Sequence, residues 1–419
     1  MRSATFLFVA AGLMLLLDAY VFQGLKAVAA GSRLKPYLYS GYWVVSLLVL
    51  VLLLVLPYLQ LDNYSKGLRT TVFALLAAFF FGQLVCSLFL LADDMRRFLQ
   101  WAAGKLFFSQ TEGEQIQEGD SISRSAFLSW LGLGAGGAIF GSLVLGFTNK
   151  YNYQVKRVAL SFPNLPAAFK GLKIIQISDI HSGSLRDRAA VRRGMETILG
   201  LQPDLILFTG DLVNNTADEM DNFMDIFSLL KAPLGVFSVL GNHDYGDYVQ
   251  WPDEAGGRSE LKRRNLERLK QVHAELGWKL LMNEHVVFQR EAEKIALIGI
   301  ENWGAKARFP KHGRLAEAHA GTEDLPFKIL MSHDPSHWDA EVRPKFPDID
   351  LMLAGHTHGM QFGVELPWFR WSPVQYMYQQ WAGLYENHSQ KLYVNRGFGF
   401  LGYPGRVGIL PEITLLELA

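Results

Sequence analysis

Four long stretches with almost no charge precede residue 150 of this 419-residue chain. A helix needs about 20 apolar residues to cross a bilayer, and each stretch is long enough. Half of all residues are hydrophobic, a high share for a soluble enzyme, and the surplus lies in this part of the chain. The sequence therefore predicts four transmembrane helices, at about 3–25, 36–61, 70–92 and 125–149.

The first stretch contains one ionisable residue, Asp18. A secretory signal is the alternative interpretation of this segment, but no small-residue cleavage pattern follows promptly and another long span comes next. An ionisable group at membrane depth suggests a function or a partner inside the protein. We expect instead that Asp18, near the end of a tilted helix, reaches the membrane interface.

The fourth stretch is rich in glycine, unlike the leucine-rich second one. Glycines at 132, 136, 137 and 141 give a spacing of small residues that suits close packing between helices. A loosely packed span that merely tolerates glycine is the alternative, and the sequence favours neither.

Lysines and arginines near the spans bear on orientation, because positive charge marks the cytoplasmic side. With four spans, the N-terminus and everything after residue 150 share a side. The opposite side holds slightly more of these residues, among them Arg96, Arg97 and Lys105. We therefore expect a multi-pass protein of the cell membrane with an extracytoplasmic C-terminal domain.

The overall charge and the cysteine content exclude two other features. The net formal charge is zero, so no strongly basic surface indicates nucleic-acid binding, and we expect no nucleic-acid partner. Cys86, the only cysteine, lies inside the third stretch, which excludes an intramolecular disulfide.

The pattern changes after residue 172 to short apolar runs that read as strands buried on both faces. Helical segments at 186–200 and 259–276 lie between some of the runs. We predict an α/β layered domain at 151–419, after a transmembrane region at 1–150. The predicted strands are "LKIIQISD", "DLILFTGD", "GVFSVLGN", "KIALIGI", "FKILMSHD", "IDLMLAGHTHG", "KLYVNRG" and "ITLLEL".

Polar clusters follow five of these strands. Taken singly, each is explained by a turn, a helix cap or a hydrogen-bonded core histidine. Ligands bind beyond the carboxyl ends of strands in α/β sheets, so five successive clusters are expected to converge on one site. The clusters are Asp179 with His181, Asp211, Asn242 with His243 and Asp244, His333 with Asp334, and His356 with His358.

The succession D-x-H, GD, GNHD, H and GHTH resembles the calcineurin-like metallophosphoesterases. "GHTHGMQFG" and the tail "YVNRGFGFLGYPGRVGILPEITLLEL" are similar to the bacterial membrane-associated branch of that family. The resemblance covers about residues 170–419 and implies a layered β-sandwich flanked by helices, with a dinuclear metal site at the strand ends. It implies one metal ion held by Asp179, His181 and His358, a second held by Asn242, His333 and His356, and a bridging carboxylate from Asp211.

Mixed oxygen and imidazole ligands suit manganese, iron or zinc, and the sequence does not choose among these divalent ions. Two such ions activate a hydroxide and neutralise charge on a phosphoryl group. A serine or cysteine nucleophile is then unnecessary, and the chain has no G-x-S-x-G or Walker sequence that indicates another chemistry.

The resemblance also implies a catalytic role for His243, as proton donor to the leaving oxygen or as a stabiliser of the phosphoryl charge. The alternative is that His243 only caps the loop. Many relatives carry an acidic residue where this chain has Asn214. An amide holds geometry but supplies no charge, so acid catalysis is expected to be weaker unless Asp244 assists.

Two further features leave alternatives open. Arg396 follows a strand and either contacts phosphate or pairs with a structural carboxylate. The aromatic stretch 364–386 either lines a lipid-facing mouth or forms ordinary core, and we expect core.

The sequence thus predicts a membrane-anchored, metal-dependent phosphoesterase that hydrolyses phosphodiester, pyrophosphate or phosphomonoester bonds. Four spans make membrane lipids its surroundings and a lipid-linked phosphate a reasonable substrate, by analogy with similar family members. The alternative is a membrane sensor or scaffold that binds metal with little turnover. A transporter has little support, because Asp18 alone marks a path through the spans.

Overall fold

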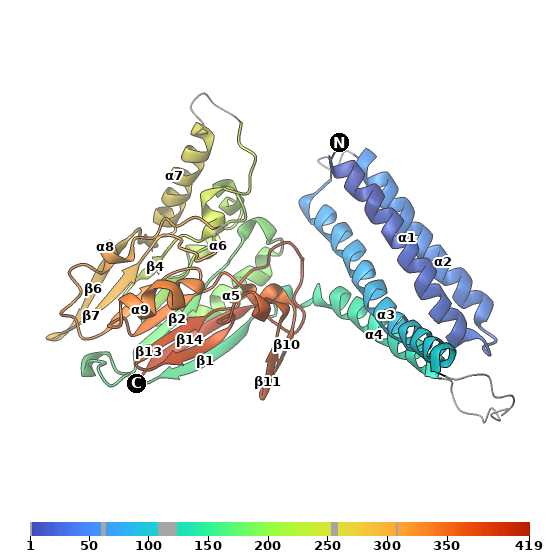
Figure 1. Ribbon diagram of the computed structural model, residues 1–419. Helices are drawn as coiled ribbons and strands as arrows, with labels where there is room; N and C mark the ends of the chain where they lie inside the picture. Colours follow the sequence, from blue (N-terminus) through green and yellow to red (C-terminus); the bar gives the residue numbers. More distant parts are fainter. Residues whose placement is uncertain (1, 60–63, 108–123, 253–258, 307–308) are drawn as a thin grey trace. The chain divides into compact units, whose positions relative to one another are not determined.

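The computed structural model describes residues 2–59, 64–107, 124–252, 259–306 and 309–419 (Figure 1). Contacts divide the chain into two compact units, Met1–Leu145 and Gly146–Ala419.

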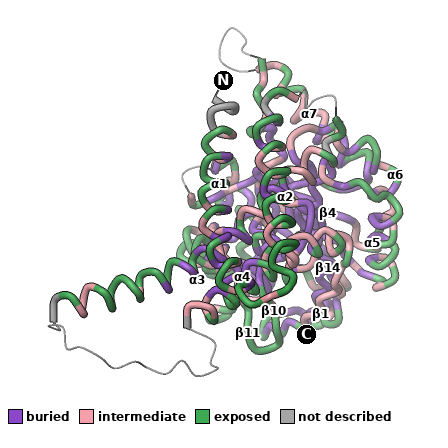
Figure 2. Tube along the Cα trace, turned by 90° about the vertical axis from the view of Figure 1, so that its right-hand side faces the viewer, coloured by how far each residue is buried: buried purple, intermediate pink, exposed green. Residues whose placement is uncertain are grey.

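The first unit is all helical. Its four long helices are all long and apolar enough to cross a membrane. Figure 2 shows that much of the surface of α1 and α2 is exposed. Many of the exposed side chains in this unit are large and apolar, as a lipid-facing surface would be, and the four predicted apolar helices are confirmed. The helices are α1 (Arg2–Ala29), α2 (Lys35–Val55), α3 (Lys66–Phe107) and α4 (Arg124–Gly146).

Helix α3 continues well beyond the predicted span 70–92. Charged side chains in the extension pair one turn apart, Asp93 with Arg96 at 2.8 Å and Asp94 with Arg97 at 3.6 Å. Pairs at this spacing stabilise a helix, which explains why the charged segment stays helical after the apolar residues end.

Asp18 is fully buried among α1, α2 and α3. The Asp18 carboxylate accepts hydrogen bonds from Ser46 Oγ and, at 2.8 Å, from Gln83 Nε2. Tyr42 donates its hydroxyl to the Asp18 carbonyl at 2.8 Å. Pairing inside the protein therefore describes Asp18 better than the expected interfacial position, because polar side chains on two other helices satisfy it.

Two of the four glycines singled out in α4 lie against α3. A Cβ added at Gly136 would lie 2.4 Å from the Gly82 carbonyl oxygen, and one at Gly132 would lie 3.1 Å from the Cys86 carbonyl oxygen. A Cβ at Gly137 would meet no atom within 4 Å. Close helix packing is therefore the correct alternative for Gly132 and Gly136.

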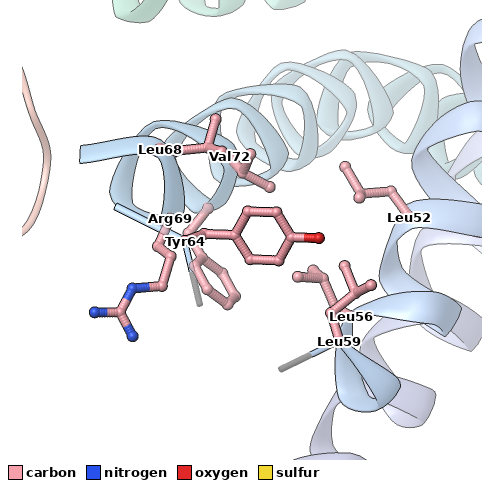
Figure 3. Close-up of a pocket in the computed structure, with 8 residues that line it drawn as sticks. Leu52, Leu56, Leu59, Tyr64, Leu68, Arg69 and Val72 are labelled. Carbon is pink, nitrogen blue, oxygen red and sulfur yellow. The ribbon is translucent and has the colours of Figure 1, made fainter. Parts of the chain in front are cut away.

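A small apolar pocket of about 150 Å³ lies between the end of α2 and the start of α3 (Figure 3). Among the residues that the structure describes, its lining has no carboxylate or imidazole that could take part in metal-dependent chemistry. The lining residues are Leu52, Leu56, Leu59, Tyr64, Leu68, Arg69, Val72 and Phe73.

The second unit contains two six-stranded sheets. One has the order β1-β14-β2-β3-β4-β5 and the other β12-β13-β9-β8-β7-β6. The first comprises β1 (Gln154–Leu160), β14 (Glu412–Leu418), β2 (Lys173–Ile177), β3 (Leu205–Phe208), β4 (Val236–Ser238) and β5 (Lys279–Leu280). The second comprises β12 (Gly383–Asn387), β13 (Gln390–Val394), β9 (Leu351–Ala354), β8 (Lys328–Met331), β7 (Glu293–Gly299) and β6 (Glu284–Arg290).

The two sheets pack face to face, with helices on both outer faces. Alternate side chains of one strand point to opposite faces, so Ile174 enters the core between the sheets while Ile175 packs toward the helices. This double burial explains the continuous apolar runs and confirms the α/β sandwich. The flanking helices are α5 (Arg188–Gly200), α6 (Met224–Phe227) and α7 (Glu260–Glu275) on one side, and α8 (Leu315–His319) and α9 (Arg343–Lys345) on the other.

All eight predicted runs form strands, and the other four strands of the two six-stranded sheets, β1, β5, β6 and β12, were not predicted. Strands β2, β3 and β4 are mutually parallel, as are β8, β9 and β13. Their carboxyl ends carry the predicted polar clusters.

Candidate metal centre

Five of the seven predicted metal ligands have a positive backbone φ angle. A positive φ, rare for residues other than glycine, places a side chain where an extended strand would not, at a cost of order 1–3 kcal/mol for each residue. Such strain persists only where the surroundings fix it, and it concentrates at functional sites. The predicted ligands with positive φ are Asp179 (53°), His181 (48°), Asp211 (61°), His356 (71°) and His358 (50°).

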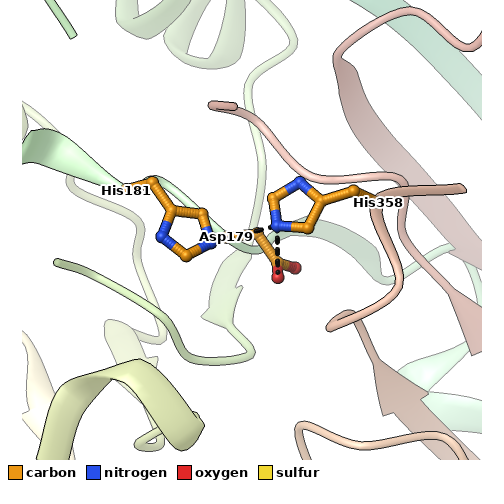
Figure 4. A group of neighbouring side chains, drawn as sticks. All are labelled: Asp179, His181 and His358. Carbon is orange, nitrogen blue, oxygen red and sulfur yellow. Dashed lines mark hydrogen bonds and ion pairs between the residues drawn. The ribbon is translucent and has the colours of Figure 1, made fainter. Parts of the chain in front are cut away.

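The first group joins the end of β2 to the loop after β9 (Figure 4). His181 Nε2 lies 3.0 Å from His358 Nε2, and His358 Nε2 lies 3.2 Å from the Asp179 carboxylate. All three side chains are buried. They present two imidazole nitrogens and a carboxylate to one point, which is a ligand set for a divalent ion.

The second group contains Asp211, His333 and His356. His333 Nε2 lies 3.2 Å from Asp211 Oδ2, and His356 Nδ1 lies 3.3 Å from His333 Nε2. The Asn242 side-chain oxygen approaches His356 Nδ1 to 2.7 Å. The structure therefore brings all four predicted residues of the second metal site together.

Asp211 belongs to the second group and also approaches the first. Its Oδ1 accepts the backbone N–H of His243 at 2.8 Å, which fixes the carboxylate. Its Oδ2 lies 3.6 Å from His181 Nε2 in one group and 3.2 Å from His333 Nε2 in the other. The Asp211 carboxylate is therefore close to imidazoles of both groups.

The charges of the site favour bound cations. Burial holds the pKa of His181 well below its usual range, which keeps the imidazole neutral and able to ligate. Burial lowers the pKa of His333, but the Asp211 carboxylate outweighs this and raises it to about 10. The buried carboxylates thus favour positive charge beside them, and a bound divalent cation would supply it.

Neighbouring groups orient the imidazoles. The Thr209 carbonyl lies 2.7 Å from His333 Nδ1, and the Tyr378 hydroxyl lies 2.8 Å from His356 Nε2. These contacts occupy the ring nitrogens that face away from the group, as outer hydrogen bonds do around protein-bound metals. The residues present therefore fit a pair of divalent ions.

His243 is held differently from what the sequence suggested. Its Nδ1 lies 2.8 Å from the backbone carbonyl oxygen of Asn214, whereas the Asn214 amide donates to Ser184 Oγ at 2.8 Å. The expectation that an amide side chain replaces the acidic group of relatives is wrong, because the Asn214 side chain points away. The His243 ring also stacks on Tyr248, with 4.3 Å between ring centroids.

Asp244 does not assist His243 either. Its buried carboxylate accepts backbone N–H groups from Asp211 at 2.9 Å, Leu212 at 2.8 Å and Gly241 at 2.9 Å. Asp244 therefore organises the backbone that carries Asp211 and Asn242, a role that the sequence did not indicate.

Of the two alternatives for Arg396, pairing with a structural carboxylate is the correct one. It is buried and pairs with Glu412 and Glu365, so it is not placed to contact phosphate. The aromatic stretch divides into two parts. Tyr378 and Trp381 pack in a small buried cluster, as expected of core, whereas Trp368 is 82% exposed, so the core prediction is wrong for the first part.

Three residues near the site were missed in the sequence. Tyr248 accepts a hydrogen bond from the Asn242 amide at 2.8 Å, Tyr378 contacts His356, and the fully buried Arg406 lies 3.4 Å from His358 Nδ1. Tyr248 follows Asn242 by six residues, a weak signal. Tyr378 and Arg406 approach only through the tertiary fold.

A cavity of about 440 Å³ opens over the two groups. His181, Asp211, His356 and His358 lie in its wall beside His243. Asn242 and Thr357 add polar side chains to the lining. The other lining residues are large apolar or aromatic ones, namely Tyr248, Phe309, Met360, Val374, Met377, Tyr378 and Leu401. The cavity therefore has one polar side, formed by the candidate metal ligands, and one apolar side.

Two family models match the chain. Residues 172–360 match the calcineurin-like phosphoesterases, and residues 1–150 match a probable calcineurin-like phosphoesterase transmembrane domain. A zebrafish (Danio rerio) transmembrane protein with a metallophosphoesterase domain is 30% identical over 63% of this chain, which spans 57% of that protein's length.

Bacterial proteins are also similar. An uncharacterized metallophosphoesterase of Bacillus subtilis is 29% identical, with 61% of this chain and 81% of that protein covered. A UDP-2,3-diacylglucosamine pyrophosphatase of Chlamydia trachomatis is 28% identical, with 59% and 83% covered. Together with the buried ligand groups and the four apolar helices, these matches show that the chain belongs to the calcineurin-like metallophosphoesterases, in the membrane-associated group that includes bacterial members.

Proposed function

We propose that this protein is a membrane-anchored phosphoesterase that uses two divalent metal ions to hydrolyse phosphodiester, pyrophosphate or phosphomonoester bonds. The closeness of Asp211 Oδ2 to imidazoles of both buried ligand groups carries the proposal. Asp179, His181 and His358 would hold one ion, Asn242, His333 and His356 the other, and Asp211 would bridge them.

When bound, two such ions supply a nucleophile from water and neutralise charge on the phosphoryl oxygens. The protein's own part is to hold the ligands rigidly. The Asp244 carboxylate fixes the Asp211 loop, and the Thr209 carbonyl and the Tyr378 hydroxyl fix two of the imidazoles. Rigid, buried ligands keep the site ready for cations before substrate arrives.

In this proposal, His243 donates a proton to the leaving oxygen. It lines the cavity, and its Nδ1 is held by the Asn214 carbonyl, which leaves Nε2 to act on a bound substrate. Because the Asn214 acceptor is a neutral carbonyl, it fixes the ring without adding a charge. General acid catalysis of this kind contributes about 10²–10⁴-fold.

A lipid-linked substrate is the class that we favour. Four candidate membrane spans are part of the same chain, and apolar side chains form much of the cavity wall. The chlamydial relative is named for a diacylated sugar-nucleotide pyrophosphate, a molecule with an apolar and a phosphate part. The charges near the spans favour an extracytoplasmic catalytic domain.

The test is hydrolysis of bis-p-nitrophenyl phosphate and p-nitrophenyl phosphate by the full chain in lipid nanodiscs. The protein is stripped of metal and then given manganese, iron or zinc. We expect metal-dependent turnover that Asp211→Asn abolishes, while Asp225→Asn on the surface leaves it unchanged. Bound metal without turnover of either ester would favour the sensor or scaffold instead.

A further inference from the structure

An isolated two-stranded hairpin follows the GHTH loop. Its strands, β10 (Val364–Leu366) and β11 (Phe369–Trp371), pair only with each other. Val364 lies opposite Trp371, and Leu366 lies opposite Phe369. Directly opposed residues of a hairpin share a face, so one face of this hairpin is entirely apolar.

The other face of the hairpin is polar and contacts the rest of the unit. Glu365 and Arg370 lie opposite each other on this face. The Glu365 carboxylate pairs with Arg396 and, at 3.5 Å, with Lys156, while Arg370 donates to the Ala382 carbonyl at 2.5 Å. The polar face is therefore satisfied within the protein, and the apolar face is turned outward.

Exposed apolar surface on the second unit gathers at this hairpin and the turn that follows it. Among its described residues, seven of the ten exposed large hydrophobic side chains lie between 360 and 377. Figure 1 shows the hairpin extending beyond the layered sheets. A patch this concentrated marks an interaction site rather than the scattered apolar residues of an ordinary surface. The seven, hereafter the hairpin patch, are Met360, Val364, Leu366, Trp368, Phe369, Tyr376 and Met377.

The hairpin patch reaches the candidate metal centre. Met360 and Met377 are about half exposed and also line the cavity. Met360 follows the predicted ligand His358 by two residues. Whatever covers the patch therefore lies at the mouth of the cavity.

A bilayer is the partner that best fits this surface. Seven residues separate the end of α4 at Gly146 from the start of β1 at Gln154, so β1 begins within about 30 Å of the end of a candidate membrane span. Tryptophan and tyrosine prefer the membrane interface, and the patch presents both. We propose that the hairpin patch inserts into the lipid interface and holds the cavity mouth against the bilayer.

The chain allows a direct test, because Cys86 is its only cysteine. In a Cys86→Ala background, Pro367→Cys in the hairpin turn carries an environment-sensitive fluorophore such as NBD. The matched control is Ala292→Cys, in the two-residue turn of the β6–β7 hairpin on the same unit. Both full-length proteins are placed in nanodiscs of phosphatidylcholine and phosphatidylglycerol, with or without a shallow doxyl-labelled lipid.

We expect the label at 367 to emit at shorter wavelength and to lose most of its emission with doxyl lipid, while the label at 292 does neither. Adding W368D and F369D should abolish quenching at 367. A solvent-like spectrum at 367, or a blue shift without doxyl quenching, would overturn the proposal, the latter because protein then covers the patch. Quenching requires no hydrolysis, so this result is separate from the activity test.

Discussion

The Asp244 carboxylate accepts a hydrogen bond from the backbone N–H of Asp211 at 2.9 Å, although 33 residues separate the two. The same carboxylate binds the N–H groups of Leu212 and Gly241, and so ties the loop after β3 to the loop after β4. The residue beside His243 thus positions two predicted metal ligands without facing the cavity.

Asp244→Asn should destabilise the protein and weaken metal binding. The asparagine amide nitrogen cannot accept hydrogen bonds from the backbone N–H groups that the Asp244 carboxylate now binds. Each lost hydrogen bond to a charged acceptor is worth about 1.5–3 kcal/mol. Thermal unfolding and metal content of the purified protein measure both effects. The exposed Asp225, which pairs with Arg188, is the matched control, because exposed pairs contribute about 0–1 kcal/mol. Equal effects of Asp244→Asn and Asp225→Asn would contradict this role.

Asn214→Ala should leave turnover close to that of the unchanged protein. The structure orients His243 through the Asn214 carbonyl, which alanine keeps. Only the bond to Ser184 is lost, at about 1 kcal/mol of stability. Kinetics with bis-p-nitrophenyl phosphate test this, and a large fall in kcat would show that the side chain orients His243 after all.

His243→Gln should reduce kcat by about 10²–10⁴-fold for esters with a poor leaving group, because the proton donor is lost. The loss should be smaller for p-nitrophenyl esters, whose leaving group needs little protonation. Metal content should not change, since His243 lies in neither ligand group. Comparing alkyl with p-nitrophenyl esters measures this difference, and equal losses for both would exclude proton donation.

His273 should make the second unit sensitive to acid. It is buried in α7 beside Ser238, and burial lowers its pKa to about 3 from a usual 6.5. The unfolded chain binds this proton below about pH 6.5, whereas the folded chain binds it only near pH 3. The free energy of unfolding therefore decreases as the pH is lowered from about 6.5 to about 3. The slope is about 1.4 kcal/mol per pH unit.

His273→Gln removes that titration and should flatten the fall in stability. Unfolding followed by tryptophan fluorescence at pH 7 and pH 5 measures it, because Trp278 lies 6.0 Å from the ring of His273. An unchanged difference between the two pH values would assign the acid sensitivity to other groups.

The sequence predicted most of the sandwich and the residues of the site because both have local signals. Strands such as β3 are buried on both faces and appear as uninterrupted apolar runs. Most residues of β6 are exposed or half-buried, and β1 carries charged residues, so neither strand forms such a run. The contact of His243 with the Asn214 carbonyl could not be predicted, because every residue type has a backbone carbonyl and the side chain at position 214 gives no signal of it.

The packing of α3 against α4 gives the last prediction. A Cβ at Gly136 would lie 2.4 Å from the Gly82 carbonyl, backbone that a side-chain rotation cannot relieve. Gly136→Val should therefore separate the two helices and lower the temperature at which the full chain unfolds in detergent. Gly137→Val is the matched control, because a Cβ there meets nothing within 4 Å. Both variants carry the same helix propensity change, so a fall in unfolding temperature for Gly136→Val alone isolates the contact. Equal effects would mean that the loss reflects helix propensity and not close approach.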